Sequence, residues 1–180
     1  MRSMTATTVC PGCKAELPRS GWTGGSDRLY ASPECHQVAS GVLGYETEHL
    51  AALGRLHQLR IDAYGAQHCG PHSPAIGTVF ALNGLYMFFE HGSTALDVRT
   101  AHTIMARTRT PWPKLSAPEH VGDLTAYDVY RLAASGAEVS EVADLVVEWA
   151  EQAWNAWPDI DSDVVRALTD ELVPRRYLRR

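Results

Sequence analysis

The sequence contains no apolar run close to the roughly 18 residues that a membrane-spanning helix requires. Residues 1–8 also lack the apolar core of a secretory signal peptide. We therefore expect a cytoplasmic protein rather than a membrane or secreted one. In a reducing compartment, the four cysteines are better interpreted as thiols or metal ligands than as disulfides.

The chain also lacks an excess of basic residues. It has 16 Lys and Arg against 21 Asp and Glu, which gives a formal net charge of −5 at pH 7. Basic side chains cluster only at the extreme C-terminus, in 175–176 and 179–180. Because nucleic-acid-binding proteins present a basic surface, we expect neither a nucleic-acid nor a membrane partner. A small-molecule substrate and a homo- or hetero-oligomer are compatible with this composition.

No internal repeat and no strand-like alternation of apolar and polar residues is evident. Helix-start signals recur instead, since Ser32-Pro33 and Ser73-Pro74 each place a capping serine before a proline suited to the first helical turn. The 45% hydrophobic content is ample for one core in 180 residues. We predict a mainly α protein of about five to six helices. A loop-rich arm at 1–40 leads into the first helix, and a helical domain follows at 41–180.

The first helix is predicted to run from Ser32 towards Gly65, with a break or bend at Gly41 and Gly44. A central buried helix is expected at 76–89, where nearly every residue is apolar. Further helices are expected at 96–107, 125–134, 140–157 and 161–172. Prolines at 111 and 113 predict a long loop over 108–122, and loops of that length are often functional.

Three cysteines have the spacing of zinc ligands. Cys10 and Cys13 enclose Pro-Gly, which suits a tight turn that presents two sulfur atoms to one ion. Cys35 lies in the first turn of the capped helix, where free backbone amides favour a thiolate. We therefore predict a Zn²⁺ site that is structural and holds the N-terminal arm.

The fourth ligand is harder to assign. His68 is our candidate, with Cys69 and His36 as alternatives. An unbroken helix would place Cys35 roughly 50 Å from His68 at a rise of 1.5 Å per residue, so His68 can serve only if the chain folds back.

The segment 57–68 places acid, base and amide groups in a helix that is expected to be buried. Glu46 and His57 fall within an apolar stripe formed by Leu43, Leu50, Leu53, Ile61 and Tyr64. A pocket there would permit acid–base chemistry, because histidine acts as a general base near neutral pH. The candidate catalytic residues are His57, Asp62, Tyr64 and Gln67. Alternatively, these groups tie helices together through buried hydrogen bonds.

A competing metal site would use Glu46 and His49. Their Glu-x-x-His spacing lets one helix offer a carboxylate and an imidazole to a carboxylate-bridged metal pair, to which Glu90 and His102 could contribute from other helices. The second copy of the motif that such a site requires is missing.

Several motifs together resemble an uncharacterised bacterial family of small cysteine-and-histidine proteins that is common in actinobacteria. They are Cys-Pro-Gly-Cys, Ser-Pro-Glu-Cys before a helix, and His-x-Leu-x-x-Asp-Ala-Tyr-x-x-Gln-His at 57–68. The resemblance covers most of the chain and implies that these are site residues, but it carries no reaction. Cys69 stands where a proline is more typical, which favours His68 as the metal ligand.

Three function classes follow. We favour a small-molecule enzyme of bacterial metabolism that performs elimination, transfer or hydrolysis by acid–base chemistry. The second class is a non-catalytic zinc-binding interaction or regulatory protein. The third is a helical protein resembling metal-dependent thiol transferases, in which a histidine-held metal activates a thiol. A closed pocket would indicate the enzyme, an exposed apolar patch would indicate the interaction protein, and an open metal position would indicate the thiol-transferase-like protein.

Overall fold

A computed structural model describes residues 6–108 and 111–179 of the chain, and the predicted mainly α fold is confirmed there. The α-helices are α1 (Pro33–Glu48), α2 (Leu50–Leu53), α3 (His57–Gln67), α4 (Ala75–His91), α5 (Ala95–Ala106), α6 (Ala126–Ala134), α7 (Val139–Asn155) and α8 (Asp159–Leu172). Two 3-10 turns, η1 (Gly54–Leu56) and η2 (Arg175–Tyr177), complete the helical elements. The first five residues of the predicted arm and the last arginine of the C-terminal basic cluster lie outside the described residues.

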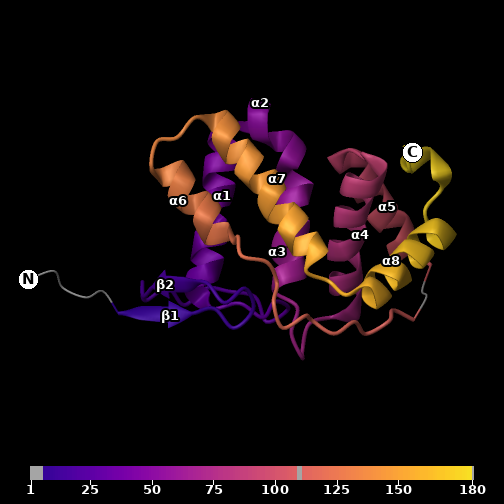
Figure 1. The fold of residues 1–180 in the computed structure, drawn as a ribbon, viewed down its shortest axis with the longest axis horizontal. Coiled ribbons are helices and arrows are strands. Elements are labelled where there is room, and N and C mark those ends of the chain that lie inside the picture. Colours follow the sequence, from indigo (N-terminus) through magenta and orange to yellow (C-terminus); the bar gives the residue numbers. More distant parts are fainter. Residues whose placement is uncertain (1–5, 109–110, 180) are drawn as a thin grey trace, which may run out of the picture.

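The helices pack around α3 and α4, which lie against each other at the centre of the molecule (Figure 1). On one side α1 packs against α6, and on the other α8 packs against α4. Helix α7 contacts both α3 and α4. The predicted central helix is confirmed as α4, in which nine residues from Thr78 to Met87 are buried.

A short antiparallel hairpin contradicts the expectation that the chain has no strands. It consists of β1 (Thr7–Val9) and β2 (Glu16–Pro18), with Thr8 opposite Leu17. Strands of three residues are too short to show a period of two. The Cys10–Cys13 turn fixes their pairing, because the Cys10 amide donates to the Ala15 carbonyl oxygen at 2.9 Å.

The predicted break at Gly41 and Gly44 is wrong, because α1 runs through both glycines to Glu48. A Cβ on Gly41 would lie 2.6 Å from the ring of Tyr130, so this glycine allows close approach of α6 rather than a bend. The chain instead turns at His49, where φ is −115° and ψ is 35°, and passes through α2 and η1 into α3.

This turn changes which residues of the predicted apolar stripe are buried. Leu53 and Tyr64 are buried, as is Glu46, but Leu43, Leu50 and Ile61 are exposed. The side chain of His57 is 40% exposed, so the prediction that it faces the core is wrong. A helical wheel drawn through residues 49–56 assumes a register that the chain does not keep.

Asp62 is buried where α3 meets α4. Its Oδ1 accepts a hydrogen bond from Gln58 Nε2 at 2.9 Å, while Oδ2 has no partner within the described part of the chain. A Cβ on Gly84 would lie 1.9 Å from Oδ2, so only glycine leaves room for the carboxyl group. Burial raises the pKa of Asp62 well above its ordinary value, and the hydrogen bond from Gln58 offsets only part of this rise.

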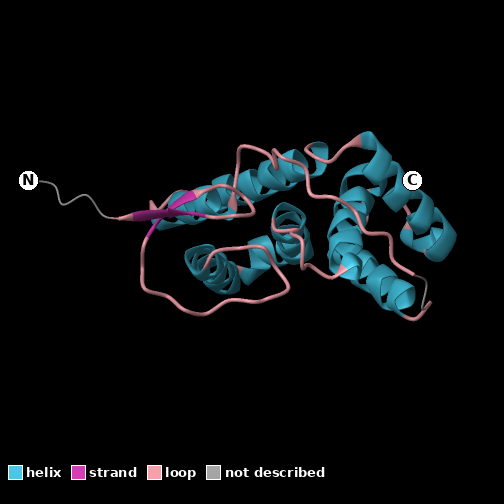
Figure 2. Cartoon of the chain, turned by 90° about the horizontal axis from the view of Figure 1, so that it is seen from below, coloured by secondary structure: helices cyan, strands magenta, loops and turns pink. Residues whose placement is uncertain are grey.

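Gln67 anchors the long loop between α5 and α6. Its Nε2 donates to the carbonyl oxygens of Val121 and Leu124 at 2.8 Å, and its Oε1 accepts from Trp149 Nε1 at 2.8 Å. The described part of this loop, 111–124, contains no helix or strand, as predicted. Several long loops cross the face of the molecule that is turned towards the viewer in Figure 2.

Within the described residues, no helix combines the length and apolarity that a membrane crossing demands.

The raised pKa of Asp62 predicts how stability depends on pH. The folded protein keeps a proton that the unfolded chain releases above about pH 4, so this stabilising contribution is complete below pH 4 and is lost as pH rises towards the folded pKa. Asp62→Asn removes this titration and retains an acceptor for Gln58. We expect the variant to gain stability relative to the wild type between about pH 5 and pH 8, as measured by urea denaturation.

Asp27→Asn, at an exposed position, is the matched control and should differ from the wild type by the same amount at both pH values. A pH-independent difference for Asp62→Asn would contradict the assignment of a buried, protonated carboxyl.

Candidate metal centre

The hairpin turn holds Cys10 and Cys13 on the same side of the chain. Cys10 directly follows β1, and its carbonyl oxygen accepts a hydrogen bond from the Lys14 amide at 3.1 Å. Gly12 lies between them, and a Cβ there would be 2.4 Å from the Tyr30 carbonyl oxygen and 2.7 Å from the His68 ring. Glycine is therefore required for this turn to reach the helices.

Cys35 lies at the N-terminal end of α1, and His68 lies at the C-terminal end of α3. Ser32 caps α1 by accepting a hydrogen bond from the Cys35 amide at 3.2 Å, as the sequence predicts. His68 is the C-terminal cap residue of α3, and its Nδ1 lies 2.7 Å from the carbonyl oxygen of Tyr64. Nδ1–H donation to that oxygen leaves Nε2 available, and Nε2 lies 3.3 Å from Cys35 Sγ.

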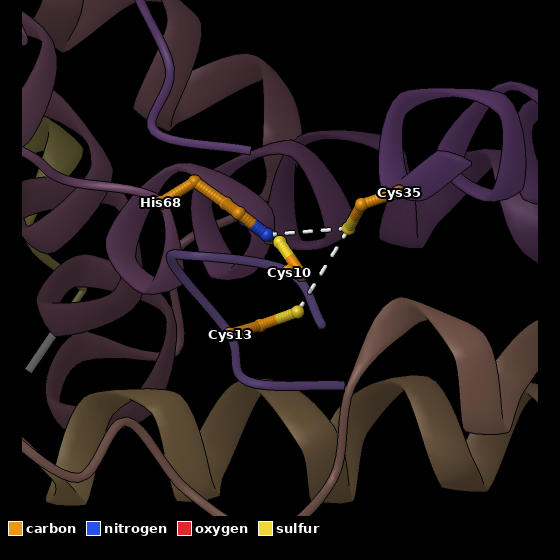
Figure 3. A group of neighbouring side chains, drawn as sticks. All are labelled: Cys10, Cys13, Cys35 and His68. Atoms are coloured by element: carbon orange, nitrogen blue, oxygen red, sulfur yellow. Dashed lines mark hydrogen bonds between the residues drawn. The ribbon is translucent and has the colours of Figure 1, made fainter. Parts of the chain in front are cut away.

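The structure brings the four predicted metal ligands together (Figure 3). One ligand atom each from Cys10, Cys13, Cys35 and His68 lies within 4.8 Å of the others, and all four residues are buried. Cys13 Sγ and Cys35 Sγ are 3.8 Å apart. Sulfur and nitrogen ligands of one tetrahedral ion lie roughly 3.5–3.8 Å apart, so the cluster is compatible with a metal site.

The two alternative fourth ligands are engaged elsewhere. Cys69 Sγ donates to the Gly65 carbonyl oxygen at 3.3 Å and to Thr78 Oγ1 at 3.2 Å, and burial raises the pKa of Cys69 to about 11. His36 Nε2 accepts a hydrogen bond from the Ser26 amide. The chain folds back at 49–56, which resolves the distance that an unbroken helix would impose on His68.

The charges of the cluster favour a cation. Hydrogen bonds from Cys13 and Cys35 lower the pKa of Cys10. Burial disfavours the imidazolium form of His68, but its contacts with Cys10 and Cys13 outweigh burial and raise its pKa to about 9. Both shifts favour negative charge on the cysteines, and a bound cation would balance that charge.

Tyr64 supports the cluster, a role that was not predicted from the sequence. Its hydroxyl donates to Cys35 Sγ at 3.6 Å, and its ring lies 4.0 Å from the ring of His68, measured between centroids. Burial raises the pKa of Tyr64, which keeps the hydroxyl protonated as a donor. Hydrogen bonds of this kind orient metal ligands and moderate the charge on a thiolate.

The structure does not bring the four candidate catalytic residues into one pocket. Tyr64 contacts the cysteine cluster, Asp62 packs against α4, and Gln67 holds the long loop. His57 lies at the opposite end of α3 from His68. Catalytic roles for these residues remain predictions.

His57 forms a separate polar cluster at the start of α3. Its Nδ1 lies 2.5 Å from Glu46 Oε1, and Arg60 Nε donates to Glu46 Oε2 at 2.7 Å. The Glu46 carboxylate is only 6% exposed. A cavity of about 400 Å³ opens beside this cluster, lined by Leu43, Glu46, Thr47, Leu50, Gly54, His57, Gln58, Ala95, Leu96 and Arg99.

The competing carboxylate-bridged metal site is not assembled. Glu46 is committed to His57 and Arg60, while the ring of His49 contacts the ring of Tyr45 in a tilted arrangement. Glu90 pairs with an arginine of α8, and His102 stacks on a ring of α4. In the described ranges, the Cys₃His cluster is the one group of three or more potential ligands that converges.

One family model matches the chain, over residues 8–158, and its description is a family of unknown function, DUF5946. No curated protein and no solved structure matches. Because the matched region contains all four ligands of the cluster and most of the chain, the protein belongs to the DUF5946 family.

Proposed function

We propose that this protein binds Zn²⁺ at the Cys₃His cluster and that the ion is structural. The observation that carries the proposal is burial of the complete ligand set, with every member at most 4% exposed. Catalytic zinc sites keep one position open for water or substrate, whereas structural sites are closed by four protein ligands. Thiolate and imidazole donors suit zinc, and the absence of oxygen ligands from this group disfavours Mg²⁺ and Ca²⁺.

The ligands join three segments of the chain, namely the hairpin turn, the start of α1 and the end of α3. A hairpin with three-residue strands is marginally stable alone, and the Cys10–Cys13 turn attaches it to α1 through Cys35 and to α3 through His68. Zinc would supply the crosslink. The residues of the chain preorganise it, since Tyr64 fixes the His68 ring and donates to Cys35 Sγ.

We also propose that the protein works in the cytoplasm. The four cysteines are free, and three of them must stay reduced to bind zinc. A reducing compartment supports that state.

The structural role of zinc predicts a specific stability loss. Purified protein should contain about one equivalent of zinc by elemental analysis. Cys10→Ser should lose the metal and at least about 3 kcal/mol of stability, because the arm would lose its crosslink. For a domain of this size the melting temperature would fall by roughly 6–12 °C.

Cys69→Ser is the matched control, since Cys69 is buried outside the cluster and donates hydrogen bonds that a serine hydroxyl can replace. It should retain the full equivalent of zinc. Wild-type protein prepared without chelators that contains well under one equivalent would refute the proposal.

The Glu46–His57 pair favours a second candidate function, acid–base catalysis on a small molecule. A buried carboxylate that accepts from Nδ1–H fixes the tautomer in which Nε2 has a free lone pair. Within the described residues, His57 Nε2 makes no hydrogen bond, and His57 lines the 400 Å³ cavity. Glu46 would be a positioning residue, and Arg60 holds its other oxygen.

This second candidate predicts a defined tautomer and a defined loss of activity. At about pH 8, where ordinary histidines are neutral, ¹⁵N NMR should show His57 protonated at Nδ1, and Glu46→Gln should weaken this preference. In a screen of small esters and carbonyl compounds, His57→Gln should lower turnover by at least 10²-fold.

His72→Gln, at an exposed histidine, should leave turnover unchanged. Equal turnover by His57→Gln and the wild type, with zinc retained in both, would contradict the catalytic role and leave the metal proposal intact.

A further inference from the structure

A second cavity lies beside the metal cluster. Its volume is about 300 Å³. Three separate loops and Tyr30 form its walls, with Pro11, Gly12 and Lys14 from the hairpin turn, Cys69–Pro71 from the segment after α3, and Lys114–Pro118 with Val121 from the long loop. Gln67 also lines it.

The chain contains only two lysines, Lys14 and Lys114, and both line this cavity. They are 100 positions apart in the sequence (114 − 14), so the fold and not local composition brings them together. Among the described residues, neither lysine has a carboxylate partner, and Lys14 Nζ donates only to the Pro11 carbonyl oxygen at 2.6 Å. No Asp or Glu lines the cavity.

Lys14 occupies a backbone position that favours glycine. Its φ is 64°, and it is the one residue other than glycine with positive φ in the described chain. An L-amino acid is strained in this left-handed region, and strain of this kind is concentrated at functional sites. The turn itself therefore gives no reason for lysine at this position.

The residues of the long loop that line the same cavity include Leu115, Ser116 and Ala117. Over the ranges that the structure describes, the amides of Leu115, Ser116 and Ala117 donate no hydrogen bond, and neither does the Ser116 hydroxyl. Two ammonium groups, a hydroxyl and uncommitted amides are the groups that bind oxyanions. Cys69 is not a nucleophile for this cavity, since its thiol donates to Gly65 and Thr78.

We propose that this cavity binds a small dianionic metabolite through Lys14 and Lys114, either a phosphate monoester or a dicarboxylate. Its volume is at the lower end of the range for small-molecule sites, which suits a compact ligand. With three thiolates, one Zn²⁺ and a neutral histidine, the cluster would carry a charge of −1. The two lysines contribute +2, so the net charge of the cluster and the cavity together stays positive. This proposal goes beyond zinc binding and relies on it only to hold the hairpin turn in place.

The test uses the zinc-loaded full-length chain in a chloride buffer free of other anions. Inorganic phosphate and succinate are titrated separately, and ¹⁵N NMR follows the amides of Gly12, Gly70 and Ser116. At least one anion should shift these resonances in a saturable way, and the stronger of the two identifies the ligand class. Raising the NaCl concentration should weaken binding.

Lys14→Gln and Lys114→Gln should each weaken binding at least about tenfold, because each removes one charged hydrogen-bond donor. Arg55→Gln removes an equal charge from an exposed arginine in η1 and should change affinity less than twofold. Lys14→Gly is the sharpest variant, since it should raise the melting temperature by relieving the left-handed backbone while it weakens binding.

Labelling provides a second readout. An amine-acetylating reagent should modify Lys14 and Lys114, and the bound anion should slow modification of both, as located by mass spectrometry. The proposal is overturned if neither anion shifts the amide resonances at about 10 mM, or if both glutamine variants bind as the wild type does. Zinc content measured on every variant shows whether a failure arises from loss of the metal centre instead.

Discussion

The convergence of Cys10, Cys13, Cys35 and His68 is the constraint on which the rest of the structure depends. The four ligands come from a hairpin turn, the first turn of α1 and the residue that directly follows α3. A glycine in the turn positions Cys10 and Cys13, a serine cap positions Cys35, and the carbonyl oxygen of a tyrosine orients His68. Three sulfur atoms and an imidazole are buried together there, and a bound cation would balance the charge of any thiolate among them.

Buried polar side chains define the packing of the helical core around that centre. Gln67 links the end of α3 to α7 and to the long loop through three hydrogen bonds. Asn83 Nδ2 donates to Thr169 Oγ1 at 2.7 Å and so joins α4 to α8. An apolar core would allow helices to slide, whereas such pairs lose their hydrogen bonds if the register shifts. These bonds support the reading in which several polar groups of segment 57–68 tie the fold together.

The sequence was sufficient to predict features that depend on local chemistry. Ser32 caps α1 as predicted, a helix forms at Ala126–Ala134 where one was expected at 125–134, and the four predicted metal ligands lie together. What it could not provide was the turn at His49, because no glycine or proline marks it and tertiary packing determines it. The contact between Glu46 and His57 could not be predicted either, because it depends on the same turn. In a continuous helix, eleven residues would separate the two groups by roughly 16 Å.

Helix α3 places the two candidate chemistries at opposite ends. His68 at its C-terminal end belongs to the metal cluster, and His57 at its N-terminal end pairs with Glu46 and faces the 400 Å³ cavity. Eleven residues of helix separate the ends by roughly 16 Å. The lysine cavity, in contrast, shares the turn of Cys10 and Cys13 with the Cys₃His cluster. Metal loss would therefore act directly on the lysine cavity and reach His57 only through the packed core, which makes the two sites physically separable.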